Sequence, residues 1–314
     1  MKQIHDVAIA GAGPAGLSAG IYTARAMLKT LILDKGLPGG QILLTDKIEN
    51  YPGFSEGVSS FSLAEKFKSQ ALKFGCEINQ EEVKKIQRKE DGWIIATEGE
   101  QYSAKAVIIA TGSSHKKLDV PGESEFTGRG VSYCATCDAA FFRDKVGAVV
   151  GGGSYALTEA LFLTKFARKV HIIHRREQFR AEKLLQKRTK ENEKINFLLN
   201  SVVTKIKGTQ KVEKANILNI ENNQEHEIEM DGMFVSIGMV PNTNIVKGLV
   251  NLNDKGEIVV QKNMATSQKG IFAAGDVTDA CSNQVATAVG AGVEAGIAVS
   301  EYIEERFITK TSTR

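Results

Sequence analysis

The sequence has little proline, few aromatic residues and few cysteines, and it lacks long apolar runs. Its 314 residues include 5 prolines, 4 cysteines and 7% aromatic residues. A membrane-spanning helix needs about 20 consecutive apolar residues, and no such stretch occurs. The opening residues also show no separate apolar segment of the kind found in signal peptides. We therefore expect a cytoplasmic protein with no membrane partner, in which a CxxC pair is catalytic or metal-binding rather than a permanent crosslink.

An excess of charge of one sign is absent as well. The chain has 40 basic and 37 acidic residues, which gives a formal net charge of +3. This near balance gives no reason to expect a nucleic-acid partner. The length and the 42% hydrophobic content suffice for two domains with buried cores. The 30 glycines suit a fold in which backbones pass close to one another and to ligands.

One local pattern occurs twice: a strand, a glycine-rich turn, a helix and a second strand. It covers residues 5–36 and again residues 145–176. Each copy is a βαβ unit of roughly 30 residues with a glycine fingerprint at its first turn. The repeat predicts an α/β fold with two Rossmann-like nucleotide-binding domains. Residues 284–305 are typical of a long helix rich in small residues, and we expect them to return to the first domain.

The first unit carries the motif GAGPAG, and Asp34 ends its second strand. The first glycine permits a tight turn, the second lets a pyrophosphate approach the backbone, and the third lets the helix pack on its strand. A carboxylate at the end of the second strand can accept hydrogen bonds from a ribose, which fits FAD and NAD equally. Two strand-ending turns, ATG and GD, favour FAD. The candidate FAD residues from these motifs are Gly11, Gly13, Gly16, Asp34, Thr111, Gly112, Gly275 and Asp276.

The second unit keeps the glycine turn but ends in HRREQFR instead of an acid. Guanidinium groups at the end of this strand match a phosphate at the ribose 2′ position, so the contrast with Asp34 predicts NADPH here. The alternative is a solvated basic face, because the following segment continues as a charged helix. The candidate NADPH residues are Gly151, Gly153, Ala156, Arg175, Arg176 and Arg180.

Cys134 and Cys137 form a CxxC motif followed directly by Asp138. A zinc site would need a second cysteine pair or a suitably spaced histidine pair, and Cys76 and Cys281 are isolated, so we expect no metal. A buried inert pair is a second alternative. The position favours a redox pair, because helix N-terminal amides lower the pKa of a thiol and Asp138 offers a nearby proton carrier.

The motifs together resemble those of the bacterial low-molecular-weight thioredoxin reductases. VSYCATCDAAFF, GGGSYALTEALFLTKFA and HRREQFRAEK carry the likeness, which extends from GAGPAG through GGQ and NYPGF to PNT and AAGDV. The resemblance implies an FAD domain, residues 1–115 and 244–314, split by an inserted NADPH domain with the CxxC motif, residues 116–243. It also implies a homodimer in which electrons pass from NADPH through FAD to the disulfide and then to thioredoxin or a thioredoxin-like protein.

Residue roles follow from the same resemblance. Cys137 would face the flavin, Cys134 would attack thioredoxin, and Asp138 would act as acid and base. The further cofactor residues that it implies are Gly40, Gln41, Asn50, Gln284, Val285 and Ala286 for FAD, and His174 for NADPH.

Four positions depart from the family pattern: Ser154, Tyr155, Thr158 and Asn283. A phenol ring at Tyr155 would crowd the pyrophosphate or the nicotinamide. These departures keep open a related flavoprotein disulfide reductase that uses another donor, such as ferredoxin, or another partner, such as a peroxiredoxin system. A nucleotide-sensing or zinc-stabilised adaptor is the rival from a different class, and a yellow flavin colour would distinguish it from the reductases.

Overall fold

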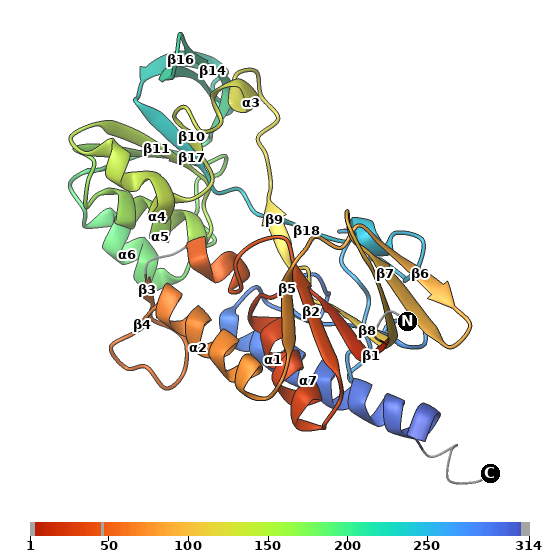
Figure 1. The fold of residues 1–314 in the computed structure, drawn as a ribbon. Helices are drawn as coiled ribbons and strands as arrows, with labels where there is room; N and C mark the ends of the chain where they lie inside the picture. Colours follow the sequence, from red (N-terminus) through yellow and green to blue (C-terminus); the bar gives the residue numbers. More distant parts are fainter. Residues whose placement is uncertain (1–3, 45–46, 309–314) are drawn as a thin grey trace. The chain divides into compact units, whose positions relative to one another are not determined.

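A computed structural model describes residues 4–44 and 47–308 of the chain (Figure 1). The chain divides into two compact units. Unit 1 contains Met1–Ser114 and Val240–Arg314, and unit 2 contains His115–Met239. Unit 2 is therefore inserted into the sequence of unit 1. No helix in the described part of the chain is long and apolar enough to cross a membrane.

Unit 1 is built on a seven-stranded sheet in the order β5-β2-β1-β8-β7-β6, with β19 paired to β8. The pairings of β5, β2, β1, β8 and β19 are parallel, whereas β6 and β7 form an antiparallel extension. The strands are β1 (Ile4–Ala10), β2 (Thr30–Asp34), β3 (Lys47–Ile48), β4 (Val58–Ser59), β5 (Glu77–Gln80), β6 (Lys85–Lys89), β7 (Gly92–Ala96), β8 (Gln101–Ile109) and β19 (Ile271–Ala273). Two further strands, β9 (Ser113–His115) and β18 (Met239–Pro241), each include residues of both units. The helices are α1 (Pro14–Arg25), α2 (Ser60–Lys73), α7 (Val285–Ile303) and the short turns η1 (Gly40–Leu44), η3 (Asn244–Val246) and η4 (Glu304–Ile308).

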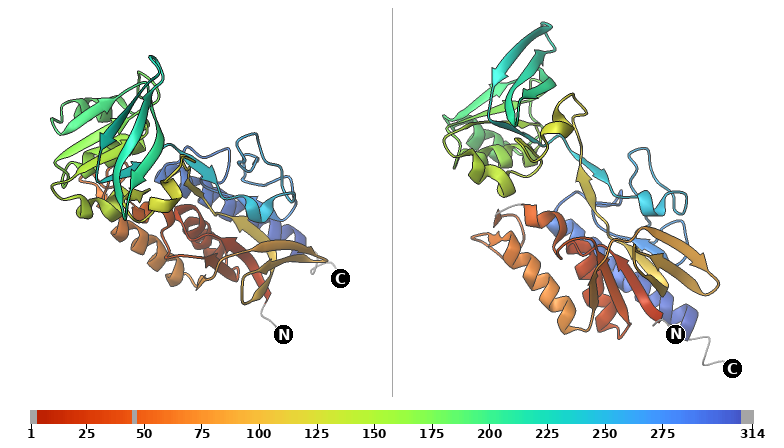
Figure 2. Two further views of the ribbon diagram at one scale, coloured as in Figure 1. Left: turned by 90° about the horizontal axis from the view of Figure 1, so that it is seen from above. Right: turned by 45° about the horizontal axis from the view of Figure 1, so that its top comes forward.

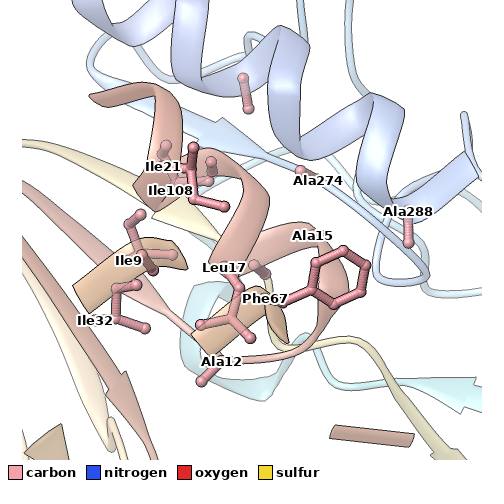
Figure 3. Packing of buried hydrophobic residues seen from close by; sticks show 14 of the residues in the cluster. Ile9, Ala12, Ala15, Leu17, Ile21, Ile32, Phe67, Ile108, Ala274 and Ala288 are labelled. Atoms are coloured by element: carbon pink, nitrogen blue, oxygen red, sulfur yellow. The ribbon is translucent and has the colours of Figure 1, made fainter. Parts of the chain in front are cut away.

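Alternate residues of the central strands of unit 1 face two different cores. Val7 and Ile9 of β1 pack with Leu17 of α1, Phe67 of α2 and Ala288 of α7, and Figure 3 shows part of this cluster. The residues between them on β1 belong to a second cluster, which includes Trp93 of β7. Helices α1, α2 and α7 thus cover one face of the sheet (Figure 2). The alternation is what a buried parallel strand with both faces covered requires.

Unit 2 contains a five-stranded parallel sheet in the order β10-β17-β11-β12-β13 and a separate antiparallel sheet, β14-β15-β16. The strands are β10 (Val131–Ser132), β11 (Val146–Val150), β12 (Lys169–Ile173), β13 (Ile195–Leu198), β14 (Ser201–Gly208), β15 (Val212–Asn219), β16 (Gln224–Glu229) and β17 (Gly232–Val235). The helices are α3 (Glu123–Phe126), α4 (Ala135–Asp138), η2 (Ala139–Phe142), α5 (Ser154–Leu163) and α6 (Lys183–Lys190).

The parallel sheet of unit 2 is also covered on both faces. Val149 and Phe234 pack with α4, η2 and α5, whereas Ala148 and Val235 pack against the antiparallel sheet. Both predicted βαβ units are present, as β1-α1-β2 and β11-α5-β12, with parallel strands. The α/β fold with two Rossmann-like units is therefore confirmed. The long C-terminal helix was predicted correctly too, since α7 packs in unit 1.

Residues 257–265 have a β-like sequence but form only isolated bridges, such as Leu252 with Ile258 and Ala265 with Phe272. Met264 has a left-handed φ of 62°, which interrupts an extended strand. The regular strand in this region is therefore limited to β19.

Candidate nucleotide and disulfide sites

The first glycine turn connects β1 to α1. A Cβ atom at Gly11 would lie 2.1 Å from the carbonyl oxygen of Ala110, and one at Gly16 would lie 1.9 Å from that of Gly11. These two glycines allow close backbone packing. A Cβ at Gly13, by contrast, would have no atom within 4 Å, and Gly13 caps α1 without a side-chain hydrogen bond. The start of α1 is thus open to an anion.

Asp34, at the end of β2, is attached to this turn. Its Oδ2 accepts a hydrogen bond from the amide of Ala12 at 2.6 Å, and its Oδ1 accepts one from the amide of Gly36 at 2.8 Å. These bonds fix the carboxylate beside the glycine turn. Each oxygen can accept a further bond, so the arrangement can bind the hydroxyl groups of a ribose.

Segments distant in the sequence meet around the start of α1. A Cβ at Gly40 would lie 3.2 Å from the Cα of Gly13. The side-chain amide of Gln41 donates to the carbonyl of Ser113 at 3.1 Å. The Oγ of Ser113 is buried and has no hydrogen-bond partner within the described chain. An orphaned buried hydroxyl at this position suits a site that is completed by a bound ligand.

The start of α7 supplies further candidates. Asn50 donates to the side-chain oxygen of Gln284 at 2.9 Å, and Gln284 forms a capping box with Thr287. Val285 and Ala286 then form the first turn of α7. The first turn of α7 has no acidic residue, so no carboxylate there neutralises the positive end of the helix dipole.

Asp276 follows β19 and lies beside Cys281, whose thiol donates to Oδ1 at 3.4 Å. Burial raises the pKa of Asp276, and the bond from Cys281 lowers it. A Cβ at Gly275 would lie 2.8 Å from the Cβ of Ala15, so this turn packs on the start of α1. Asp276 therefore lies near the glycine turn, in a place where a ligand hydroxyl could bind its carboxyl group.

Thr111 and Gly112 lie just after the strand β8, which ends at Ile109. The Thr111 hydroxyl, however, donates to the carbonyl of Asn242 at 2.8 Å, and the Asn242 side chain donates back to the carbonyl of Thr111 at 2.9 Å. The side chain of Thr111 thus connects the two segments of unit 1 that lie before and after the inserted unit 2 in the sequence. No local sequence pattern predicted this second role of Thr111.

The second glycine turn connects β11 to α5 in unit 2. A Cβ at Gly151 would lie 2.2 Å from the carbonyl oxygen of Ser236 and 2.7 Å from the Cβ of Ala156. A Cβ at Gly153 would have no atom within 4 Å, and Gly153 caps α5 without a side-chain hydrogen bond. This turn therefore repeats the features of the first one. The ring of Tyr155 does not fill the space at Gly153.

His174 supports the second turn from behind. A Cβ at Gly152 would lie 2.3 Å from the His174 ring. The ring stacks on Phe179 with centroids 5.3 Å apart, and its Nε2 lies 3.1 Å from the carbonyl oxygen of Gln178. Burial, together with the nearby arginines, lowers the pKa of His174, although the contact with Gln178 raises it. His174 is thus a packed imidazole beneath the turn.

Arg175, Arg176 and Arg180 are exposed beyond the end of β12. The backbone amide of Arg180 donates to the carbonyl of Gly152 at 2.8 Å, which fixes this segment to the glycine turn. Within the described part of the chain, none of the three guanidinium groups has an ion pair or a hydrogen bond. They can therefore bind an anion without first giving up a protein partner.

The cysteine motif lies between β10 and η2. Cys134 is buried and disulfide-bonded, whereas Cys76 and Cys281 are free thiols. The side chain of Cys137 lies outside the described residues. The helix α4 after Cys134 is a single turn that ends at Asp138, so it is too short to provide a large dipole.

Glu159 was not identified from the sequence. It is 5% exposed on α5, and its carboxylate oxygen accepts the amide of Ala135 at 2.7 Å. The amide next to Cys134 is therefore bound to a carboxyl group and is not directed at a sulfur atom. An acidic residue on the otherwise apolar face of α5 is the sequence signal that could have revealed it.

No group of three or more His, Cys, Asp and Glu side chains within residues 4–44 and 47–308 is placed to hold a metal ion. Burial raises the pKa of the Cys76 thiol to about 12, and this thiol donates to the carbonyl of Gly20 at 3.1 Å. Cys76 is thus a packing residue of unit 1.

Comparison with known proteins gives the family. Residues 5–295 match the pyridine nucleotide-disulphide oxidoreductases. The chain belongs to this family. It is 43% identical over 306 residues to a thioredoxin reductase of Mycolicibacterium smegmatis, with 97% of this chain and 98% of that protein covered. It is 43% identical over 305 residues to the thioredoxin reductase of Bacillus subtilis (strain 168), with 97% and 96% covered.

A solved structure shows the same likeness in three dimensions. The thioredoxin reductase of Lactococcus lactis superimposes with a TM-score of 0.93 at 41% identity, covering 96% of this chain and 99% of that one. This member of the pyridine nucleotide-disulphide oxidoreductases is therefore similar to thioredoxin reductases over nearly its whole length. The resemblance inferred from the motifs is confirmed.

Proposed function

We propose that this protein is a thioredoxin reductase that transfers electrons from NADPH through FAD to the disulfide of Cys134 and Cys137 and then to thioredoxin. The observation that carries the proposal is the disulfide-bonded Cys134 within a chain that matches thioredoxin reductases almost end to end. A homodimer in the cytoplasm belongs to the same proposal.

FAD is assigned to unit 1. The open backbone at Gly13 would bind the pyrophosphate, Asp34 a ribose, and Asp276 a ribityl hydroxyl. The start of α7 at Gln284 would lie by the flavin ring, where the helix dipole favours negative charge. Bound FAD supplies a carrier that accepts a hydride from a nicotinamide and reduces a disulfide. The remaining residues of this site are Gly11, Gly16, Gly40, Gln41, Asn50, Thr111, Gly112, Gly275, Val285 and Ala286.

NADPH is assigned to unit 2. The pyrophosphate would bind at Gly153 and the start of α5, and Arg175, Arg176 and Arg180 would bind the 2′-phosphate. His174 would act indirectly, by supporting the glycine turn. The three guanidinium groups, which have no partner among the described residues, favour NADPH over a protein donor such as ferredoxin, which needs no 2′-phosphate site.

The dithiol chemistry uses residues of unit 2. The Cys134 thiolate would attack the thioredoxin disulfide and form a mixed disulfide, which Cys137 would resolve. Asp138 would carry the proton to the leaving thiolate. For each turnover, NADPH and one proton reduce one thioredoxin disulfide to a dithiol.

The test is a steady-state assay of the purified protein with thioredoxin. We expect a yellow protein that oxidises NADPH in repeated turnovers only when thioredoxin is present. The Cys134→Ser variant should lose thioredoxin reduction, while NADPH still bleaches its flavin under anaerobic conditions. A colourless folded protein would contradict the flavin assignment, and bleaching by reduced ferredoxin but not by NADPH would identify another donor.

A further inference from the structure

Glu159 connects the nucleotide-binding helix of unit 2 to the disulfide segment. It lies on α5, which begins at the second glycine turn, and its side chain is almost completely buried. One carboxylate oxygen accepts the amide of Ala135 at 2.7 Å, and the other accepts the hydroxyl of Ser236. A buried acid with these partners is costly to desolvate, so its position beside Cys134 calls for a functional reason.

The same helix binds the other side of Cys134. The hydroxyl of Tyr155, one helical turn before Glu159, lies 3.3 Å from the carbonyl oxygen of Tyr133 and also hydrogen-bonds with Glu159. The carbonyl of Tyr133 and the amide of Ala135 belong to the two peptide groups that flank Cys134. Both peptide groups are therefore attached to α5 through one hydrogen-bonded network.

The carboxyl group of Glu159 can keep its hydrogen-bond partners whether it holds a proton or releases it. When Glu159 is a carboxylate, it can accept bonds from Ala135, Ser236 and Tyr155. When it is protonated, it can donate to the Tyr155 oxygen, and the Tyr155 hydroxyl then donates to the carbonyl of Tyr133. The change needs only a rotation of one hydroxyl group. Both protonation states are thus compatible with the same backbone.

The charge near Cys134 affects the balance between the protonated and the ionised form of Glu159. Burial raises the pKa of Glu159, and its bonds to Ala135, Ser236 and Tyr155 lower it. A thiolate at Cys134 would add negative charge next to the peptide group that Glu159 binds, and like charges in a buried site favour protonation of the acid. Reduction of the disulfide should therefore raise the pKa of Glu159 further.

Other titratable and charged groups lie on elements that pack against α5. They are Asp138 on α4, Lys169 and His171 on β12, and Lys183, Lys187, Arg188 and Lys190 on α6. Within the described chain, however, the hydrogen-bond partners of the Glu159 carboxyl are Ala135, Ser236 and Tyr155, of which Tyr155 alone titrates.

We propose that Glu159 is a positioning residue of the redox disulfide, which takes up a proton when the disulfide of Cys134 is reduced and releases it on reoxidation. Reduction breaks the S–S bond with two electrons, which the proposed donor supplies, and leaves one thiol and one thiolate. One proton goes to the thiol and a second goes to the Glu159 carboxylate. The inference rests on the proposed function, because it concerns the same disulfide.

The test measures the reduction potential of the disulfide against pH. Full-length protein carrying its flavin is equilibrated in dithiothreitol redox buffers, and the peptide containing Cys134 and Cys137 is quantified by alkylation and mass spectrometry. In the wild type, the potential should fall more steeply with pH in the range where reduction adds the extra proton. Glu159→Gln keeps the shape and the acceptor for Ala135 but cannot take up the proton.

The glutamine variant should lose the steeper segment. Above that segment its disulfide should be easier to reduce, by up to about tenfold in equilibrium constant, or about 30 mV for a two-electron couple. Ser236→Ala removes a donor that stabilises the carboxylate, so the steeper segment should move to higher pH. This second variant keeps the test decisive even where Glu159→Gln folds poorly.

Glu123 offers a matched control in the same unit. It is also buried, and it accepts the amides of Leu118 and Asp119 and the hydroxyl of Tyr133. Glu123→Gln should leave the pH profile unchanged. Equal profiles for Glu159→Gln and wild type, or equal shifts in both glutamine variants, would overturn the inference. A wild-type disulfide that cycles reversibly but does not pass electrons to thioredoxin would instead contradict the proposed function alone.

Discussion

Gly152 and Gly153 are neighbours in one turn, yet added side chains would meet different surroundings. A methyl group at Gly152 would collide with the buried His174 ring at 2.3 Å, whereas one at Gly153 would meet no atom within 4 Å. Gly152→Ala should lower the free energy of unfolding by about 1 to 3 kcal/mol, the usual cost of overpacking. Gly153→Ala should leave it nearly unchanged. Chemical denaturation of both variants measures the difference.

The same pair also tests the nucleotide assignment. Gly153→Ala would place a methyl group where the pyrophosphate is proposed to approach the backbone, so it should weaken binding of NADPH and NADH alike. Isothermal titration of the two nucleotides measures this effect. Unchanged nucleotide affinity in a fully folded Gly153→Ala variant would argue against a pyrophosphate at this turn.

Arg175 and Arg176 should determine the preference for NADPH over NADH. Each charge-assisted hydrogen bond to the 2′-phosphate contributes about 1.5 to 3 kcal/mol, so two together favour NADPH on the order of a hundredfold or more. The double change Arg175→Ala and Arg176→Ala should remove most of this preference by weakening NADPH alone. Rates of flavin reduction with both nucleotides measure it.

Arg143 provides the control for this double change, because it is an exposed arginine of the same unit that lies outside the HRREQFR segment. Arg143→Ala should retain the NADPH preference. Slow and equal reduction of the wild-type flavin by both nucleotides would show that the arginines form only a solvated basic face.

At the scale of single residues, spacing predicted the glycine turns and the acid at Asp34, because their roles depend on local backbone geometry. The sequence did not predict that the His174 ring lies under Gly152, or that Glu159 binds the amide of Ala135. These contacts join residues that are far apart in the chain or on different elements, and no local pattern specifies them. That Tyr155 crowds the nucleotide stays a prediction; the sequence did not predict that its hydroxyl donates to the carbonyl of Tyr133 at 3.3 Å.

At the scale of elements, glycines let α7 approach α1 closely. A Cβ at Gly292 would lie 2.2 Å from the carbonyl oxygen of Ala15, whereas one at Gly290 would have no atom within 4 Å. Gly292→Ala should therefore destabilise unit 1 by about 1 to 3 kcal/mol and weaken FAD retention, since it would push α7 from the start of α1.

Gly290→Ala on the same helix is the matched variant. It should stabilise the protein by up to about 1 kcal/mol, because alanine has a higher helix propensity and the site is exposed. Thermal unfolding followed by circular dichroism and by flavin release measures both changes. Equal effects of the two substitutions would contradict close packing of α7 on α1.

Long elements with clear periodicity were predicted from the sequence, whereas the lengths of the short ones were not. The helix α7 and the strands of both βαβ units follow from apolar patterns that extend over whole elements. The single-turn α4 and the bridges within residues 257–265 depend on contacts with other segments. Their sequences carry too few residues for a period to emerge.

At the scale of the whole molecule, the chain passes twice from one unit to the other. Within each unit, the two chain ends at these points lie close together. In unit 2, the amide of Lys116 donates to the carbonyl of Gly238 at 2.9 Å. In unit 1, the Ser114 hydroxyl donates to the side-chain oxygen of Asn242 at 2.7 Å. Adjacent ends are what tolerated domain insertions require, so each unit should be separable from the other.

We therefore expect two independent folding units with different ligands. A chain that joins residue 114 to residue 240 through a short glycine-rich linker should fold and bind FAD, because the residues assigned to the flavin all lie in unit 1. Residues 115–239 alone should fold as a colourless protein that binds NADPH in preference to NADH through Arg175 and Arg176. Neither piece should reduce thioredoxin with NADPH, because flavin and disulfide are then on separate chains. Absorbance spectra and nucleotide titrations of the two pieces measure these properties, and flavin bound by residues 115–239 would contradict the assignment of cofactors to units.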